Sequence, residues 1–251
     1  MTDDELGRRV RDAHGDAWQV HGRLREFVGG GTAEQPGVRL MASGLPHPQW
    51  NNGDVSEPDR VDLDAVRAWY APRAAQWGVR VPAGEPWPHG RHLFRKRLMG
   101  LHSADLVVPP TPPGVEIARA VGSDDFEAVL DVDLAVFGGD RDLQRRWAQP
   151  HFDTAVSEVG LARLDGAAVA AAYVVHSSGW AGPAAYLSGV CVLPFARGRR
   201  IAGALSAWLL TRAFAAGAEL AHLHPDDDRA AAVYRALGFV EVPGLDIYVD
   251  L

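Results

Sequence analysis

The second half of the chain alternates short apolar runs with amphipathic stretches. Three successive apolar runs within residues 156–194 have the length and alternation of neighbouring strands, and Asp165-Gly166 between the first two is a typical hairpin turn. Helical patterns precede these strands at 124–137 and 140–152 and follow them at 201–217 and 227–238. Adding strands at 115–121, 219–225, 239–242 and 245–251, the order is β-α-α-β-β-β-α-β-α-β-β, which predicts an α/β fold with a mixed sheet.

The first half has a less regular pattern. It predicts a helix over about 4–28, a strand in "GVRLMASG", a turn at Asn52-Gly53, a helix from Asp62 onward, a strand in "VRVPAG" and a basic helical stretch in "GRHLFRKRLMGL". No motif in this half carries recognisable chemistry.

A proline-rich segment, "VVPPTPPGV" at 107–115, separates the two halves. Its prolines favour a stiff, extended connection and are incompatible with a helix interior. We therefore predict a first domain over 1–108, a linker at 109–114 and a second domain over 115–251.

Charge and composition narrow the functional classes. The chain has 251 residues with 25 Lys+Arg and 32 Asp+Glu, and its net charge of −7 falls entirely within 113–251. A general nucleic-acid-binding protein needs a broad basic face, so that class is disfavoured. No apolar run is long enough to span a membrane, the charged start does not resemble a secretory signal, and a single cysteine fits a reducing compartment. We expect a soluble cytoplasmic protein.

An arginine cluster interrupts this acidic half at "VLPFARGRRIAGAL", residues 192–205. An apolar strand precedes the cluster and a helix follows it. The N-terminus of a helix has unpaired N–H groups and partial positive charge, so it is suited to a phosphate or pyrophosphate. Gly198 allows close approach of the backbone, and Arg197, Arg199 and Arg200 add charged donors. The alternative is a solvated turn without function.

The segment "VCVLPFARGRRIAGALSAWLL" resembles the acyl-CoA-binding region of the GNAT superfamily of N-acetyltransferases, in which a V-x-V-x-P strand leads into an R-x-x-G-x-G/A turn. Further on, "HLHPDDDRAAAVYRALGF" is similar to the second signature of that family. The resemblance covers about 113–251 and implies a GNAT-like fold there. The first half resembles a smaller, degenerate copy of the same fold, as in tandem members, on element order and "ASGLPHPQWNNG".

The resemblance implies roles for individual residues. The backbone around Val190, Cys191 and Val192 is expected to hold the pantetheine arm and the acyl carbonyl, and Tyr234 to protonate the leaving sulfur. The pyrophosphate is expected at the turn and the first helical residues. The residues expected there are Arg197, Gly198, Arg199, Arg200, Ile201, Ala202 and Gly203.

Two positions depart from the family pattern. Arg200 replaces the central glycine of the turn, and we expect it to have ordinary helical dihedral angles. Asp227 replaces the usual asparagine. We favour a role for Asp227 as the N-cap of the last helix, with Asp226 as the alternative cap; a contribution of Asp227 to the coenzyme site is the other possibility.

The general base is not defined by the sequence. Tyr186 occupies the position of the glutamate that some family members carry, and a phenol is a poor base at neutral pH. Glu158 and His176 are the candidates, with His151 or a water chain as alternatives.

Cys191 and the pair His222 and His224 receive structural interpretations. Cys191 is expected to be a buried apolar residue and not a nucleophile. His222 and His224 lack a third ligand at useful spacing, so we expect no metal site.

Together these observations predict an N-acyltransferase that uses acetyl-CoA to acylate a small-molecule amine by direct attack. Non-catalytic acyl-CoA binding, acyl-CoA decarboxylation on the same fold and simple phosphate binding remain as alternatives. A cationic acceptor is favoured by the acidic residues of the first helix of the second half. These residues are Asp124, Asp125, Glu127, Asp131 and Asp133.

Overall fold

The computed structural model describes residues 3–251 and divides the chain into two compact units. Unit 1 comprises residues 1–98 together with 241–251, and unit 2 comprises 99–240. This division differs from the predicted domain limits. The proline-rich segment 109–114 lies inside unit 2, and the last strand of the chain belongs to unit 1.

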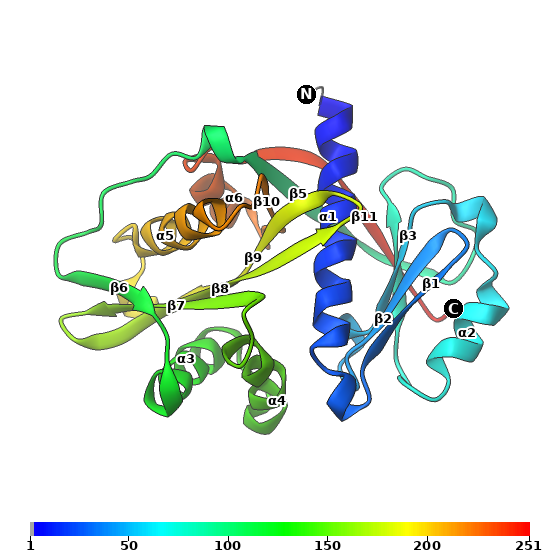
Figure 1. Cartoon of the computed structure of the whole chain (residues 1–251), viewed down its shortest axis with the longest axis horizontal. Coiled ribbons are helices and arrows are strands. Elements are labelled where there is room, and N and C mark those ends of the chain that lie inside the picture. Colours follow the sequence, from blue (N-terminus) through cyan, green and yellow to red (C-terminus); the bar gives the residue numbers. More distant parts are fainter. Residues whose placement is uncertain (1–2) are drawn as a thin grey trace. The chain divides into compact units, whose positions relative to one another are not determined.

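Unit 1 is a small sheet with helix α1 on one face and α2 on the other (Figure 1). Neighbouring strands run in the order β1-β2-β3-β4-β11. The bounds are α1 Asp3–Arg23, β1 Gly31–Gln35, β2 Val38–Ala42, β3 Asn52–Val55, α2 Leu63–Tyr70, β4 Gly78–Pro82 and β11 Val240–Val249. Strand β5, Arg91–His102, begins in this unit and ends in unit 2.

Apolar side chains of the strands pack beneath α2, where Leu40, Val66 and Tyr70 are fully buried. The opposite face, beneath α1, carries charge. Arg39 on β2 lies opposite Asp54 on β3, and Asp54 lies opposite Arg80 on β4. One row of alternating charges therefore crosses three strands under the helix.

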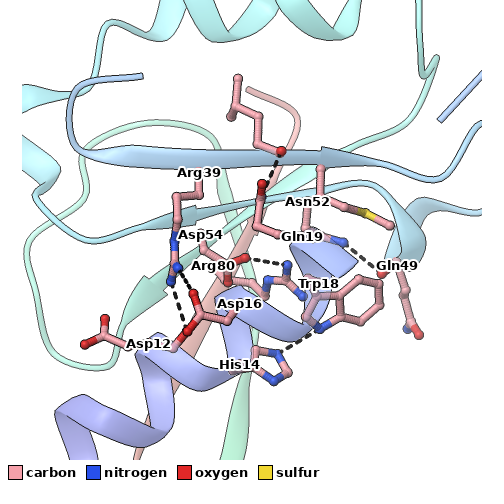
Figure 2. Close-up of polar contacts among 12 residues, drawn as sticks. Asp12, His14, Asp16, Trp18, Gln19, Arg39, Gln49, Asn52, Asp54 and Arg80 are labelled. Carbon is pink, nitrogen blue, oxygen red and sulfur yellow. Dashed lines mark hydrogen bonds and ion pairs between the residues drawn. The ribbon is translucent and has the colours of Figure 1, made fainter. Parts of the chain in front are cut away.

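Figure 2 shows how these buried charges are paired. Arg39 forms an ion pair with Asp16 of α1, and Arg80 forms one with Asp54 at 2.8 Å. The guanidinium of Arg80 also lies 4.5 Å from the centre of the Trp18 ring. Leaving any of these charges buried alone would cost several kcal/mol, and the contacts of Arg39 with Asp16 and of Arg80 with Trp18 hold α1 on the sheet.

Unit 2 contains a mixed sheet with strands in the order β5-β10-β9-β8-β7-β6. Helices α5 and α6 cover one face, and α3 and α4 cover the other (Figure 1). The bounds are β6 Val115–Arg119, α3 Gly122–Phe137, α4 Arg141–Phe152, β7 Ser157–Leu164, β8 Ala167–Gly179, β9 Gly182–Val192, α5 Ile201–Ala215, β10 Leu220–Leu223 and α6 Asp228–Arg235.

The predicted element order of the second half is confirmed, with one change at its end, where the two closing strands are a single strand, β11. In the first half, "GRHLFRKRLMGL" is wrong as a helix, since it forms β5. Asn52-Gly53 is wrong as a turn, since it begins β3. Strand β1 was not predicted. None of the helices in the described part of the chain is long and apolar enough to cross a membrane.

Candidate functional site

Strands β9 and β10 are parallel neighbours that pair over only a short stretch. Ala184–Tyr186 pairs with Leu220–His222, whereas β9 continues to Val192 and β10 ends at Leu223. Since β10 stops one residue after the paired stretch, the edge of β9 from Leu187 onward loses this neighbour. Backbone N–H and C=O groups along that edge are available to an extended ligand.

A bulge lies in the same part of β9. Ala171 of β8 is paired with Cys191, and Tyr173 with Ser188, so β9 has one extra residue between these pairs. Gly189, inside the bulge, has a φ of 61°, and a Cβ there would lie 2.7 Å from the Tyr173 ring. Glycine is therefore required for this bend, which turns the backbone of β9 next to its open edge.

The turn between β9 and α5 has the geometry of an anion-binding loop. Gly198 has a φ of 78° and Arg200 a φ of 62°, whereas Arg199 between them has a negative φ. Alternating signs of φ direct successive N–H groups into one concavity, and the N-terminus of α5 lies directly behind it. The three arginines of the turn are exposed. The loop can hold a phosphate group by its backbone and side chains together.

Our expectation for Arg200 was wrong. Its left-handed conformation, with φ 62° and ψ 16°, is that of a residue outside the helix, and Arg200 is the N-cap of α5. The steric cost of this conformation for a residue with a Cβ is on the order of 1–2 kcal/mol. Strain of this kind is concentrated at functional sites.

Other residues of the loop and helix have the following places. Ile201 and Gly203 are buried and Ala202 is half-buried. A Cβ at Gly203 would meet Val233 and Leu237 at ordinary contact distances. Asp227 caps α6, because its Oδ1 accepts a hydrogen bond from the N–H of Ala230 over 2.7 Å. The capping role that we favoured for Asp227 is therefore confirmed.

Tyr234 lies on α6 and is 8% exposed, in the same core cluster against which Val190 and Val192 pack. Burial raises the pKa of Tyr234, and the negative charge of Asp226 and the Cys191 thiol add to this effect. The phenol therefore stays protonated at neutral pH, as a proton donor must. Tyr234 and the end of β9 therefore share one core cluster.

Cys191 points toward the opposite face of the sheet, into the cluster formed with α3. It is 2% exposed, and its thiol donates to the carbonyl oxygen of Ala171. Burial, followed by the charge of Asp133, raises the pKa of Cys191 to about 12. The expectation that Cys191 is a buried residue is therefore confirmed, and a raised pKa disfavours the thiolate form that a nucleophile needs.

Glu158 and His176 lie away from the end of β9 that carries Cys191. The pairing places Glu158 two strands away from Cys191 and three residues along, roughly 10 Å in each direction. His176 lies five residues further along β8 than Ala171, the partner of Cys191, roughly 17 Å away. Glu158 is also occupied, because Arg212 donates to it from Nε.

His151, the other candidate, is 3% exposed and stacks on the ring of Tyr173 at 4.3 Å between centroids. His222 is fully buried and stacks on Tyr186 at 4.9 Å. Among residues 3–251 there is no group of three or more side chains arranged to hold a metal ion.

The sequence did not predict the buried ion pairs of unit 1 or the apolar environment of Asp133. Asp16 of α1 pairs with Arg39 of β2, and Asp54 of β3 pairs with Arg80 of β4; the partners are more than 20 residues apart in each case, so no local pattern shows them. Asp133, on α3, had a local signal. Val129, Val132 and Val136 occupy positions i, i+3 and i+7 of one helix face, and Asp133 occupies position i+4 of the same face. A carboxylate at this position interrupts an otherwise apolar face.

The fold and site define an α/β protein with a splayed pair of parallel strands and a strand–turn–helix anion loop. Residues 126–239 match the acetyltransferase (GNAT) family, so this segment of the chain is a GNAT domain. The chain is 22% identical to a GCN5-related N-acetyltransferase from Kribbella flavida, with a TM-score of 0.71, covering 95% of this chain and 94% of that one.

A tandem GNAT protein from the clavulanic acid biosynthesis pathway has the same fold, with 17% identity and a TM-score of 0.57 over 84% of this chain and 77% of that one. The fold of the whole chain is therefore that of GNAT-type structures, including the smaller first half. Among curated proteins, the tRNA-dihydrouridine synthase B of Serratia marcescens is 29% identical over 119 residues, which is 46% of this chain. The matched segment spans about a third, 31%, of that relative's length.

Proposed function

We propose that this protein is an acyl-CoA-dependent N-acyltransferase that transfers an acetyl group from acetyl-CoA to the amine of a small molecule. The observation that carries the proposal is the open edge of β9, which leads directly into the anion loop at Gly198–Arg200. A coenzyme A molecule has an extended, amide-containing arm that ends in a pyrophosphate, and these two features match the strand edge and the loop in order. The single cysteine supports action in the cytoplasm.

In the proposed complex the pyrophosphate binds the N–H groups and arginines of the loop, and the pantetheine arm pairs with the backbone of Val190 and Val192. The thioester carbonyl lies at the bulge of β9, where backbone N–H groups stabilise the oxyanion. The neutral amine nitrogen attacks the carbonyl carbon and loses a proton to a base, the C–S bond breaks, and the thiolate takes the proton of the Tyr234 hydroxyl, which solvent then restores. Binding both substrates in one complex supplies the proximity that direct transfer requires.

We propose that the acceptor is a cation before it reacts. Of the acidic residues of α3, only some are available to attract it. Three carboxylates of α3 are already paired with arginines of the same unit. These pairs are Asp125 with Arg163, Glu127 with Arg145 and Arg141, and Asp131 with Arg141. Asp133 is not among them, and its charge raises the pKa of the Cys191 thiol on the neighbouring strand β9.

The test is thiol release from acetyl-CoA by the purified full chain with a panel of primary amines, combined with calorimetric titration of coenzyme A. We expect amine-dependent thiol release, a product heavier by one acetyl group, and coenzyme A binding that disappears when Arg197 and Arg199 are both changed to alanine. Binding without thiol release for any amine would indicate a non-catalytic acyl-CoA-binding protein. Release of carbon dioxide from malonyl-CoA would indicate a decarboxylase.

A further inference from the structure

Asp133 is a carboxylate in an apolar environment. It lies on α3 within the stripe formed by Val129, Val132 and Val136, which packs against β8 and β9 in the cluster that contains Cys191. Residues spaced at i, i+3, i+4 and i+7 share one helix face, so Asp133 lies on the flank of α3 that meets the sheet.

No ion pair or hydrogen bond is formed by Asp133 with any residue of 3–251 that the structure describes. Its neighbours on the helix differ in this respect, since Glu127 is held by Arg145 at 2.6 Å and Asp131 by Arg141 at 2.7 Å. Burial raises the pKa of Asp133 to about 6. A half-buried carboxylate without a partner costs free energy that the fold does not recover from any contact of its own.

The position of Asp133 relative to the coenzyme site explains that cost. The stripe of α3 that carries Asp133 packs in one cluster with Cys191 of β9, and Tyr234 belongs to the cluster against which Val190 and Val192 of β9 pack. The charge of Asp133 raises the pKa of the Cys191 thiol. Asp133 approaches β9 from the face covered by α3, whereas Tyr234 approaches it from the face covered by α6. A group bound at the open edge of β9 therefore has a carboxylate on one face of the sheet and a phenol on the other.

We propose that Asp133 is the general base of the acyl transfer, a proposal that rests on the proposed N-acyltransferase function. The acceptor binds as an ammonium ion next to the Asp133 carboxylate and loses one proton to solvent, which leaves the neutral amine. As its nitrogen forms the bond to the thioester carbon, Asp133 takes the proton that leaves the nitrogen. The C–S bond breaks, and the thiolate takes the hydroxyl proton of Tyr234. Solvent then removes the proton from Asp133 and returns one to Tyr234, which balances the reaction.

Other ionisable groups around this part of α3 do not compete for that role. Across the same cluster lie the Cys191 thiol of β9, whose pKa is raised to about 12, and the Tyr173 hydroxyl of β8. On α4, the His151 ring is stacked on Tyr173, and Arg145 is held by Glu127. Of these ionisable groups, Asp133 is the one that is negatively charged at neutral pH, and no arginine among the described residues pairs with it.

The experiment compares Asp133→Asn with Asp131→Asn, a matched change on the same helix at an exposed carboxylate that pairs with Arg141. We expect Asp133→Asn to lower kcat by roughly 10²–10⁴-fold, the range for one positioned base, with coenzyme A affinity unchanged. Asp131→Asn is expected to keep kcat within threefold of the wild type. In the wild type, kcat/KM should fall at low pH with an apparent pKa near that of Asp133. The residual kcat/KM of Asp133→Asn should not show this decrease at low pH.

The two possible failures are distinguishable. If the wild type releases no thiol with any amine, the proposed function fails and the assignment of Asp133 fails with it. If the wild type is active and Asp133→Asn retains kcat within threefold, the proposed function stands and Asp133 is not the base. A variant that loses coenzyme A affinity instead of kcat would also overturn the assignment, since it would show that Asp133 shapes the coenzyme site.

Discussion

Arg212 of α5 donates from Nε to Oε1 of Glu158 on β7 over 2.5 Å. The carboxylate is mostly buried, with 14% of its side chain exposed, whereas 48% of the arginine side chain is exposed. This ion pair fixes α5 on the sheet from the side opposite its anion loop, and it removes Glu158 from the set of free carboxylates.

We therefore predict that Glu158→Gln lowers stability without lowering turnover. Loss of a partly exposed ion pair costs up to about 1 kcal/mol in the free energy of unfolding. Urea denaturation measures the loss, and a double-mutant cycle with Arg212→Gln isolates the pairwise contribution. A kcat reduced by more than tenfold in Glu158→Gln would restore Glu158 as a catalytic candidate.

Arg197 supports the loop from its first position, because its Nε donates to the carbonyl oxygen of Val192 over 3.1 Å. The rest of the guanidinium is exposed and available to a phosphate. We predict that Arg197→Ala weakens coenzyme A binding by roughly 1–3 kcal/mol, the range for a lost charged hydrogen bond. Calorimetry measures the change, and Arg146→Ala, at an exposed position on α4, is the control. Equal affinity in both variants would place the coenzyme elsewhere.

The left-handed backbone of Arg200 predicts opposite effects for two neighbouring glycine substitutions. Arg200→Gly relieves the strain of a positive φ and should raise the free energy of unfolding by about 1 kcal/mol. Arg199→Gly, at a negative φ, should lower it by roughly 0.5–1 kcal/mol through the greater freedom of the unfolded chain. Both variants lose a cation and should bind coenzyme A more weakly. A destabilised Arg200→Gly would mean that the side chain, and not the backbone, dominates at this position.

Tyr234→Phe keeps the ring and its packing against Phe239 and removes the hydroxyl. Because the phenol acts as the sulfur leaves, we predict a fall in kcat of roughly 10²–10⁴-fold with little change in coenzyme A affinity or melting temperature. Tyr248→Phe on β11 is the control for loss of a phenol. Early unfolding of the Tyr234 variant would instead identify Tyr234 as a packing residue.

Asp133→Asn should stabilise the protein in a pH-dependent way. The pKa of this carboxyl rises from 3.8 to about 6 on folding, so ionised Asp133 destabilises the folded state. This destabilisation is absent below pH 3.8 and is complete above pH 6. We predict that Asp133→Asn is about 1–2 kcal/mol more stable than the wild type at pH 8, with allowance for solvent screening, and equal to it near pH 3.5. Thermal denaturation at both pH values measures this, and destabilisation at pH 8 would contradict it.

The second half of the fold was predictable because each of its elements has a strong local signal. Asp165 and Gly166 both have positive φ, as a tight hairpin turn requires, and the Asp227 cap marks the start of α6. The anion loop was found from residue types that act locally. The backbone of Arg200 was not predictable, since arginine gives no indication of a left-handed conformation.

The errors of the first half come from partners that are distant in the sequence. The arginines of "RHLFRKRLMGLH" look like an exposed helix face, but Arg95 pairs with Asp246 and Arg97 with Glu241, both more than 140 residues away. Asn52 and Gly53 form a strand because β2 and β4 flank them on both sides. Tertiary pairing overrides local preference in both places.

The return of β11 to unit 1 affects how the chain folds as it is made. Unit 2 is contiguous, from residue 99 to 240, whereas unit 1 needs residues 241–251, which leave the ribosome after everything else described here. Leu245–Val249 pairs with Gly78–Pro82, so this edge of β4 has no strand partner while unit 2 is being synthesised. We expect the half that is translated first to be the half that is completed last.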